Sequence, residues 1–92
     1  MARLKWARSA TRHRVTRRRS RYVIEHSGLR FRIPRPPGRA DDRLVYLGDD
    51  AEGVALEVMV VELGADELLV IHAMPLRERY RAQHEEARKW RR

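Results

Sequence analysis

The hydrophobic residues of this 92-residue chain gather in its second half, where three short apolar runs follow one another between Arg43 and Met74. The runs are rich in Val, Leu and Ile, and the segments between them consist of Asp, Glu, Gly and Ala. β-Branched residues favour strands, and short polar segments of this composition form hairpin turns. We therefore predict an antiparallel meander with strands at 43–47, 54–63 and 68–74.

The middle run alternates between two kinds of residue, as a strand with two different faces does. One set is entirely apolar: Val54, Leu56, Val58 and Val60. The other set is partly polar: Ala55, Glu57, Met59 and Val61. This pattern predicts a central strand covered on one side. A second clear alternation at 29–33 predicts a fourth strand, which presents Arg30 and Arg32 side by side on one face.

The segments on either side of these strands have helical patterns. Residues 9–27 are predicted to be helical, in one bent piece or two short ones, with Thr16 as an N-cap. Residues 1–8 form either a short first strand or an extended lead-in. Residues 75–91 are predicted to form a helix with Pro75 in its first turn. Its buried stripe contains Leu76, Tyr80, His84 and Ala87. The predicted fold is a single α+β domain: an N-terminal helical segment, a four-stranded antiparallel meander and a C-terminal α-helix.

The net charge of +8 is spread unevenly along the chain. Residues 1–24 hold nine Lys or Arg and no acid, residues 25–74 have a net charge of −5, and residues 75–92 have +4. A polyanion is the natural partner of such cationic ends, although basic runs also occur on surfaces that bind nothing. The predicted phosphate-binding residues are Arg17, Arg18, Arg19, Arg21, Arg30 and Arg32.

Several classes of protein are disfavoured by what the sequence lacks. It has no cysteine, so it offers neither a disulfide framework nor a thiolate zinc site. Its four histidines show no recognised metal-ligand spacing, and no Gly-rich phosphate loop or nucleophile elbow is present. We expect no metal, no cofactor and no small-molecule ligand. No apolar run is long enough to cross a bilayer, so we expect no membrane association and a cytoplasmic location.

Three short motifs carry a resemblance to a known family. The first is Trp6 with the sequence His-Arg-Val-Thr at 13–16, and the second is the Arg-x-x-x-x-Gly pattern at 43–48. The third runs through Ile-His-Ala at 71–73 into Arg-Glu-Arg-Tyr at 77–80. These resemble the K-H-G-V-[ST], R-x-x-x-x-G and S-A-R followed by R-E-R motifs of BrnT-type toxins. The BrnT-type toxins belong to bacterial type II toxin-antitoxin pairs and share the RelE-like fold of small ribonucleases.

The resemblance covers most of the chain, with three departures. Arg14 replaces the turn glycine, His72 replaces the serine, and Met74 stands where the family usually has an arginine. The family implies a metal-independent endoribonuclease that degrades mRNA, free or on the ribosome, and that a cognate antitoxin neutralises. Cleavage by a 2′-hydroxyl requires a proton acceptor, stabilisation of the phosphate charge and a proton for the leaving oxygen.

The candidate catalytic residues are His72, Arg43 and Arg77. Histidine suits either proton-transfer role, and arginine suits the phosphate. His72 shares the strand parity of Leu68 and Val70, so it points into the core or opens at the rim of the sheet.

Met74 favours an alternative in which the chain is a non-catalytic relative that inhibits a protein target such as a topoisomerase, or a basic nucleic-acid-binding module. In the toxin interpretation, we expect the antitoxin and RNA to share the face that carries Arg30 and Arg32.

Overall fold

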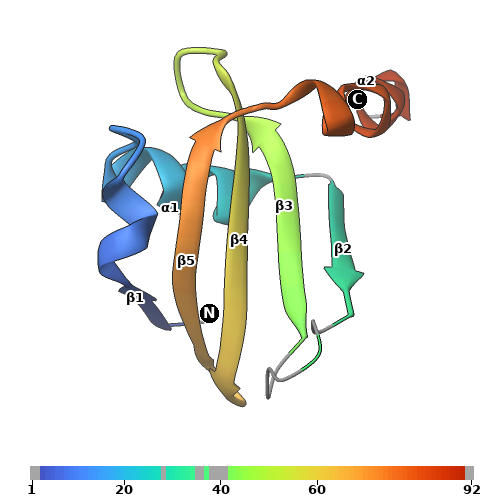
Figure 1. Cartoon of the computed structure of the whole chain (residues 1–92). Helices are drawn as coiled ribbons and strands as arrows, with labels where there is room; N and C mark the ends of the chain where they lie inside the picture. Colours follow the sequence, from blue (N-terminus) through green and yellow to red (C-terminus); the bar gives the residue numbers. More distant parts are fainter. Residues whose placement is uncertain (1–2, 28, 35–36, 38–41, 91–92) are drawn as a thin grey trace.

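Five strands form one mixed sheet, with α1 on one face and the C-terminal segment on the other (Figure 1). The computed structural model describes residues 3–27, 29–34, 37 and 42–90. The strands are β1 (Arg3–Trp6), β2 (Leu29–Ile33), β3 (Arg43–Asp49), β4 (Ala55–Gly64) and β5 (Glu67–Pro75). The helical elements are the 3-10 helices η1 (Arg8–Thr11) and η2 (Glu78–Tyr80) and the α-helices α1 (Arg17–His26) and α2 (Arg81–Trp90).

The predicted α+β class and the antiparallel meander β2-β3-β4-β5 are confirmed, with strand ends within two residues of those predicted. The prediction of a four-stranded, wholly antiparallel sheet is wrong. β1 adds a fifth strand that runs parallel to β5, from Arg3 opposite Glu67 to Trp6 opposite Val70. Leu4 and Trp6 pack on the core, whereas Arg3 and Lys5 reach Glu67 at 3.8 and 3.3 Å. Of the two alternatives predicted for residues 1–8, the short first strand is the one that forms, since four residues are too few for this alternation to decide between them from sequence alone.

The helix predictions are confirmed in part. Segment 9–27 contains η1 and α1, but a turn separates them, in which Arg14 has a φ of 63°. Thr16 is the N-cap of α1 as predicted, and its hydroxyl accepts from the Arg19 amide at 3.2 Å. The predicted helix at 75–91 begins too early, because Pro75 is still in β5, opposite Leu56. Proline is tolerated at a strand end, where its missing N–H interrupts no ladder. Residues 1, 2 and 91 of these predicted segments lie outside the described residues.

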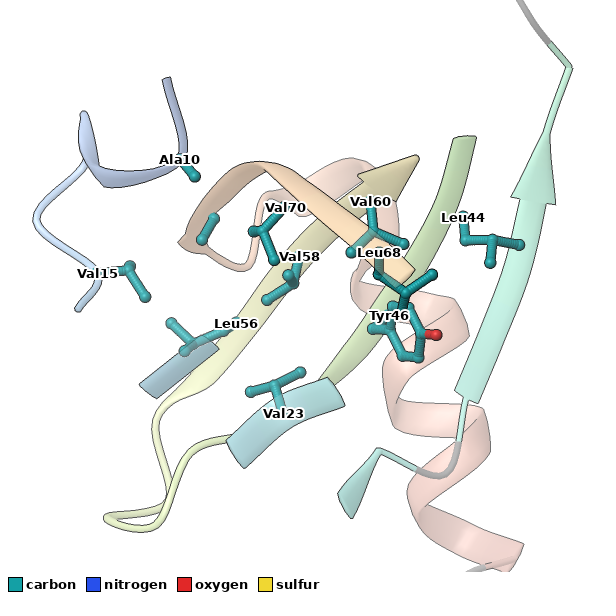
Figure 2. Close-up of a cluster of buried hydrophobic side chains, with 11 residues drawn as sticks. Ala10, Val15, Val23, Leu44, Tyr46, Leu56, Val58, Val60, Leu68 and Val70 are labelled. Carbon is teal, nitrogen blue, oxygen red and sulfur yellow. The ribbon is translucent and has the colours of Figure 1, made fainter. Parts of the chain in front are cut away.

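The sheet has a buried cluster on each face. On the face under α1, the buried residues include Val15, Val23, Leu44, Tyr46, Leu56, Val58, Val60, Leu68, Val70 and Ala73 (Figure 2). We call this the α1 face. On the opposite face, Tyr80 packs with Val45 and Leu47, and Leu29, Phe31, Ile33, Met59 and Leu76 surround them. We call this the α2 face.

The expectation that the central strand is covered on one side is therefore wrong. Glu57 of β4 points to the α2 face and is completely buried, with a relative exposure of 0%. Tyr80 and His84 are buried as predicted, with exposures of 5% and 2%. The imidazole of His84 in α2 also bonds to Asp49 of β3 at 3.1 Å. The C-terminal segment thus closes the second face of the sheet through both apolar and polar contacts.

Candidate functional site

A β-bulge in β5 decides where His72 points. Val60 of β4 is opposite Val70, but its neighbour Met59 is opposite His72, so β5 contains one extra residue at Ile71. Each extra residue turns the following side chains to the other face of the sheet. Val70 faces the α1 core, whereas His72 joins Met59 on the α2 face. The predicted common parity of His72 with Leu68 and Val70 is therefore wrong, because the bulge separates them.

The buried carboxylate of Glu57 lies at the base of this region. It accepts from the Arg77 backbone amide at 2.9 Å, from Arg77 Nε at 3.1 and 3.0 Å, and from Arg77 Nη2 at 2.7 Å. Burial alone raises the pKa of a carboxyl group, but here the hydrogen bonds and charge of Arg77 outweigh burial and hold the pKa of Glu57 below its ordinary value. Glu57 is therefore a carboxylate at neutral pH.

The second oxygen of Glu57 orients His72. His72 Nε2 lies 3.2 Å from Glu57 Oε2, and because a carboxylate only accepts, we infer that Nε2 carries the hydrogen. The Nδ1 lone pair is then available to accept a proton. Desolvation lowers the pKa of His72, Glu57 opposes this shift, and the charges on Arg77 and His13 add to it; the net result is a lowered pKa. His72 is thus a neutral, partly exposed base at neutral pH, with 21% of its side chain accessible.

A cavity of about 340 Å³ opens above these residues. Its lining consists of Ile33, Arg43, Met59, His72, Arg77, Arg79 and Tyr80. The three predicted catalytic residues, His72, Arg43 and Arg77, therefore come together although they belong to separate parts of the chain. The guanidinium of Arg77 is occupied by Glu57, so its main effect is to hold that carboxylate in place. Arg43 and Arg79 supply the guanidinium groups that a phosphate bound in the cavity would meet.

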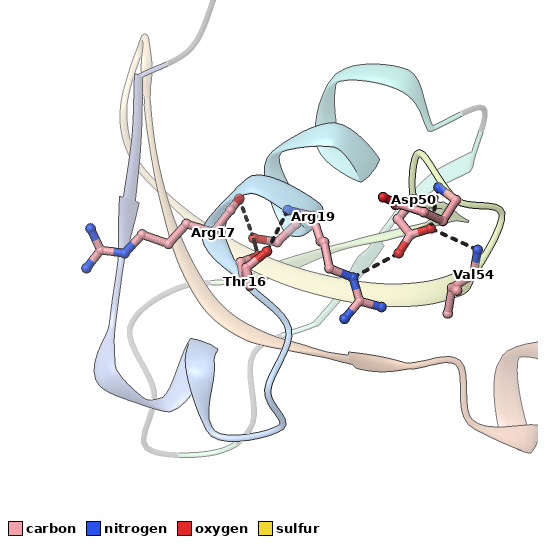
Figure 3. Close-up of polar contacts among 7 residues, drawn as sticks. Thr16, Arg17, Arg19, Asp50 and Val54 are labelled. Carbon is pink, nitrogen blue, oxygen red and sulfur yellow. Dashed lines mark hydrogen bonds and ion pairs between the residues drawn. The ribbon is translucent and has the colours of Figure 1, made fainter.

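The predicted phosphate-binding arginines of α1 have structural contacts. Arg19 Nε donates to Asp50 Oδ2 at 2.8 Å, and Asp50 Oδ1 accepts from the backbone amides of Glu52 and Val54, both at 2.9 Å (Figure 3). The charged groups of Arg17 and Arg21 lie over the Trp6 ring, at 5.5 and 5.1 Å from its centroid. The indole nitrogen of Trp6 in turn donates to Ser20. Arg18 is exposed.

Arg30 and Arg32 lie on the α1 face, opposite Tyr46 and Leu44 in the register of β2 and β3. Arg32 pairs with Glu62 at 3.1 Å, and Arg30 lines a hollow of about 400 Å³ that also contains Glu62. The cavity with His72 is on the opposite face of the sheet. The structure therefore separates the predicted phosphate-binding arginines from the predicted catalytic residues.

Three residues of the site were not predicted from the sequence: Glu57, Arg79 and His13. Glu57 carries a recognisable signal, because a lone acid among the apolar residues of a central strand is stable only when it is paired. His13 belongs to the turn before α1, and its ring centroid lies 5.7 Å from that of His72. That contact depends on the chain path around the edge of β5, which no local pattern reveals.

Other functional signals are few in the part of the chain that the structure describes. Within it, no group of three or more His, Cys, Asp or Glu side chains is placed to hold a metal ion. None of the helices in those residues has the length and apolar character needed to cross a membrane. Comparison with known proteins adds no relative, since no protein-family model and no curated protein matches this sequence.

Proposed function

We propose that this chain is the toxin component of a type II toxin-antitoxin pair and that it acts as a metal-independent endoribonuclease on mRNA. The cognate antitoxin would neutralise it. One observation carries the proposal: His72, Arg43 and Arg77 gather in a single cavity, where a buried carboxylate, Glu57, orients the imidazole. A neutral, oriented histidine beside arginines supplies two of the three things that attack by a 2′-hydroxyl requires, a proton acceptor and stabilisation of the phosphate charge.

In the proposed reaction, Nδ1 of His72 accepts the proton of the 2′-hydroxyl as O2′ attacks the adjacent phosphorus. Arg43 and Arg79 stabilise the negative charge that grows on the phosphoryl oxygens. The bond from phosphorus to O5′ then breaks and O5′ accepts a proton from a general acid or from water, which leaves a 2′,3′-cyclic phosphate and a 5′-hydroxyl. Glu57 keeps the Nε2 hydrogen of His72 in place and stabilises the imidazolium that forms, and Arg77 maintains Glu57 as a carboxylate.

Two details of the backbone and register support the family resemblance. Arg14, at the position of the family's turn glycine, has a φ of 63°, a conformation that glycine adopts without strain. Met74, at the position of the family's arginine, is opposite Glu57 in the sheet. Arg77 follows three residues later and brings its guanidinium to that same carboxylate. Arg77 thus brings an arginine to the face on which position 74 lacks one, with its guanidinium engaged by Glu57.

The test uses purified protein and a short synthetic RNA in the presence of EDTA. The wild-type protein is expected to cleave the RNA and to leave 2′,3′-cyclic phosphate ends, and an RNA with a single 2′-deoxy substitution is expected to resist cleavage at that position. His72→Ala and Arg43→Ala are expected to lower the activity by about 100-fold or more. Folded wild-type protein that leaves RNA intact, both free and on ribosomes, would contradict the proposal.

A second candidate is a non-catalytic toxin that inhibits a protein target. It is favoured by Met74 and by the engagement of Arg77 with Glu57, since both reduce the number of arginines available to a substrate. Expression in bacteria separates the two functions. Growth arrest that persists in His72→Ala and Arg43→Ala, with cellular RNA intact, would support protein inhibition and exclude the ribonuclease.

A further inference from the structure

The turn that carries His13 is fastened to β5 beside His72. β1 ends opposite Val70, so the outer edge of β5 beyond this residue is available to the segment that follows β1. There Ser9 Oγ donates to the carbonyl of Ile71 at 2.7 Å. Ile71 is the bulge residue that turns His72 to the α2 face. The anchor of the turn and the orientation of His72 therefore depend on the same point of β5.

The other end of the turn is equally constrained. Val15 is buried in the α1-face core with an exposure of 2%, and Thr16 caps α1. Between the two anchors, Arg14 adopts a left-handed backbone conformation that non-glycine residues rarely occupy. A residue keeps a strained backbone conformation only where the contacts around it hold it there, and such residues concentrate at functional sites.

His13 occupies the exposed position between these anchors. Its ring meets that of His72 edge-on, with an interplanar angle of 67° and a centroid separation of 5.7 Å. Two imidazoles at this separation can each come within hydrogen-bond reach, about 2.6–3.2 Å, of different oxygens on one phosphate group. They also differ in environment, because His72 is partly buried and His13 is exposed.

We propose that His13 is a second catalytic residue, the general acid that protonates the leaving O5′ while His72 acts as the base. This inference rests on the proposed ribonuclease function. The proton of the 2′-hydroxyl goes to His72, the new bond joins O2′ to phosphorus, the bond from phosphorus to O5′ breaks, and the proton of the His13 imidazolium goes to O5′. No electrons are lost or gained by either reactant. The guanidinium groups of the cavity are too weakly acidic for this role, and Tyr80 is 5% exposed.

The test compares two RNA substrates that differ in one atom. In one, the leaving O5′ is replaced by sulfur, and a thiolate leaves without being protonated because thiols are far more acidic than alcohols. His13→Ala is expected to slow cleavage of the ordinary RNA by about 100-fold or more and to cleave the sulfur substrate at close to the wild-type rate. His72→Ala is expected to be slow on both substrates. His26→Ala, which removes another exposed imidazole, serves as the matched control.

His13→Gln is measured in parallel, and the thermal unfolding of each variant shows that it is folded. A folded His13 variant that cleaves ordinary RNA at the wild-type rate, or that is slowed equally on both substrates, overturns the acid role and leaves the ribonuclease function standing. Wild-type protein that cleaves neither substrate overturns the ribonuclease function and the role of His13 together.

Discussion

Two buried carboxylates, Asp50 and Glu57, resemble each other in most respects and differ in what surrounds them. Their relative exposures are 4% and 0%, and each bonds to an arginine at less than 3 Å. In each, burial alone would raise the pKa, and hydrogen bonds outweigh it, so that both pKa values fall below their ordinary range. Burial and the direction of the pKa shift therefore do not distinguish the two acids.

Their remaining partners separate them. Asp50 accepts from two backbone amides and from Arg19, and these contacts close the turn between β3 and β4. Glu57 shares its second oxygen with His72, which titrates and lines a cavity. Of the two acids, only Glu57 has a partner in the cavity that can exchange a proton, which makes Glu57 the candidate for a functional role.

The largest expected difference between the two acids is in catalysis. Glu57→Gln keeps the shape of the side chain but removes the charge that orients and stabilises His72. We expect it to lower kcat/KM for RNA cleavage by about 10-fold to 100-fold, and His72→Ala to lower it by roughly 100-fold to 10,000-fold. Asp50→Asn is expected to leave kcat/KM unchanged per folded molecule. RNA cleavage rates normalised to folded protein check this prediction. If Glu57→Gln and Asp50→Asn lowered kcat/KM equally, Glu57 would have no catalytic role that Asp50 lacks.

The next effect concerns the two faces of the sheet. Arg43 and Arg30 lie on adjacent strands but on opposite faces, and only Arg43 lines the cavity. Arg43→Ala is expected to lower kcat for a short RNA by about 100-fold, because it removes charge stabilisation at the phosphate. Arg30→Ala, the matched control, is expected to change it by less than about 3-fold.

The outcome for these two variants also bears on the antitoxin, which was expected to share one face with RNA. A large loss of cleavage in Arg30→Ala would show that RNA crosses the α1 face on its way to the cavity. Such a result would support the expectation that RNA and the antitoxin bind the face that carries Arg30 and Arg32.

A smaller effect is expected on stability. Asp50→Ala leaves the amides of Glu52 and Val54 and the guanidinium of Arg19 without their acceptor, at a cost of about 2–3 kcal/mol of unfolding free energy. Because the pKa of Asp50 is lowered by folding, its contribution is fully present above its ordinary value of 3.8 and is lost as pH falls through the folded value. Urea unfolding between pH 7 and pH 3 should show a flatter acid limb for Asp50→Ala. Asp66→Ala, in the exposed turn before β5, serves as the control for removal of an acid.

Local patterns were enough to predict most of the fold. The alternation at 29–33 and the apolar runs of β3, β4 and β5 specify strands because one face of each must be buried. Thr16 was predicted as a cap because its hydroxyl accepts a bond that the first turn of α1 leaves open. The strand β1 was only one of two alternatives for residues 1–8, and its parallel pairing was not predicted, because it is four residues long and gains its stability from β5, which is more than 60 residues away in sequence.

The site was predicted less completely, for a related reason. Arg43, His72 and Arg77 were identified as candidates. The bulge at Ile71, which brings His72 to their face, cannot be recognised from the order of apolar and polar residues in the sequence. The arginine run of α1 predicts a free cationic surface, whereas Arg19, Arg17 and Arg21 contact Asp50 and Trp6. A pattern along the chain shows which residues are charged, and only tertiary contacts show which charges are already engaged.

The smallest and most specific effect is on the protonation of His72, and it can be measured whether or not RNA is a substrate. Histidine resonances followed by NMR as a function of pH should give His72 a pKa below its ordinary value of 6.5. Glu57→Gln should lower this pKa further, since the carboxylate favours the protonated ring, and His13→Ala should raise it, since charge on His13 disfavours that ring. Asp50→Asn should leave it unchanged. Because folding lowers this pKa, the contribution of His72 to stability is complete above about pH 6.5 and is lost as pH falls through the folded value. If the pKa of His72 were unchanged in Glu57→Gln but shifted in Asp50→Asn, the pairing of His72 with Glu57 would be wrong. The difference between the two buried acids would then be wrong as well.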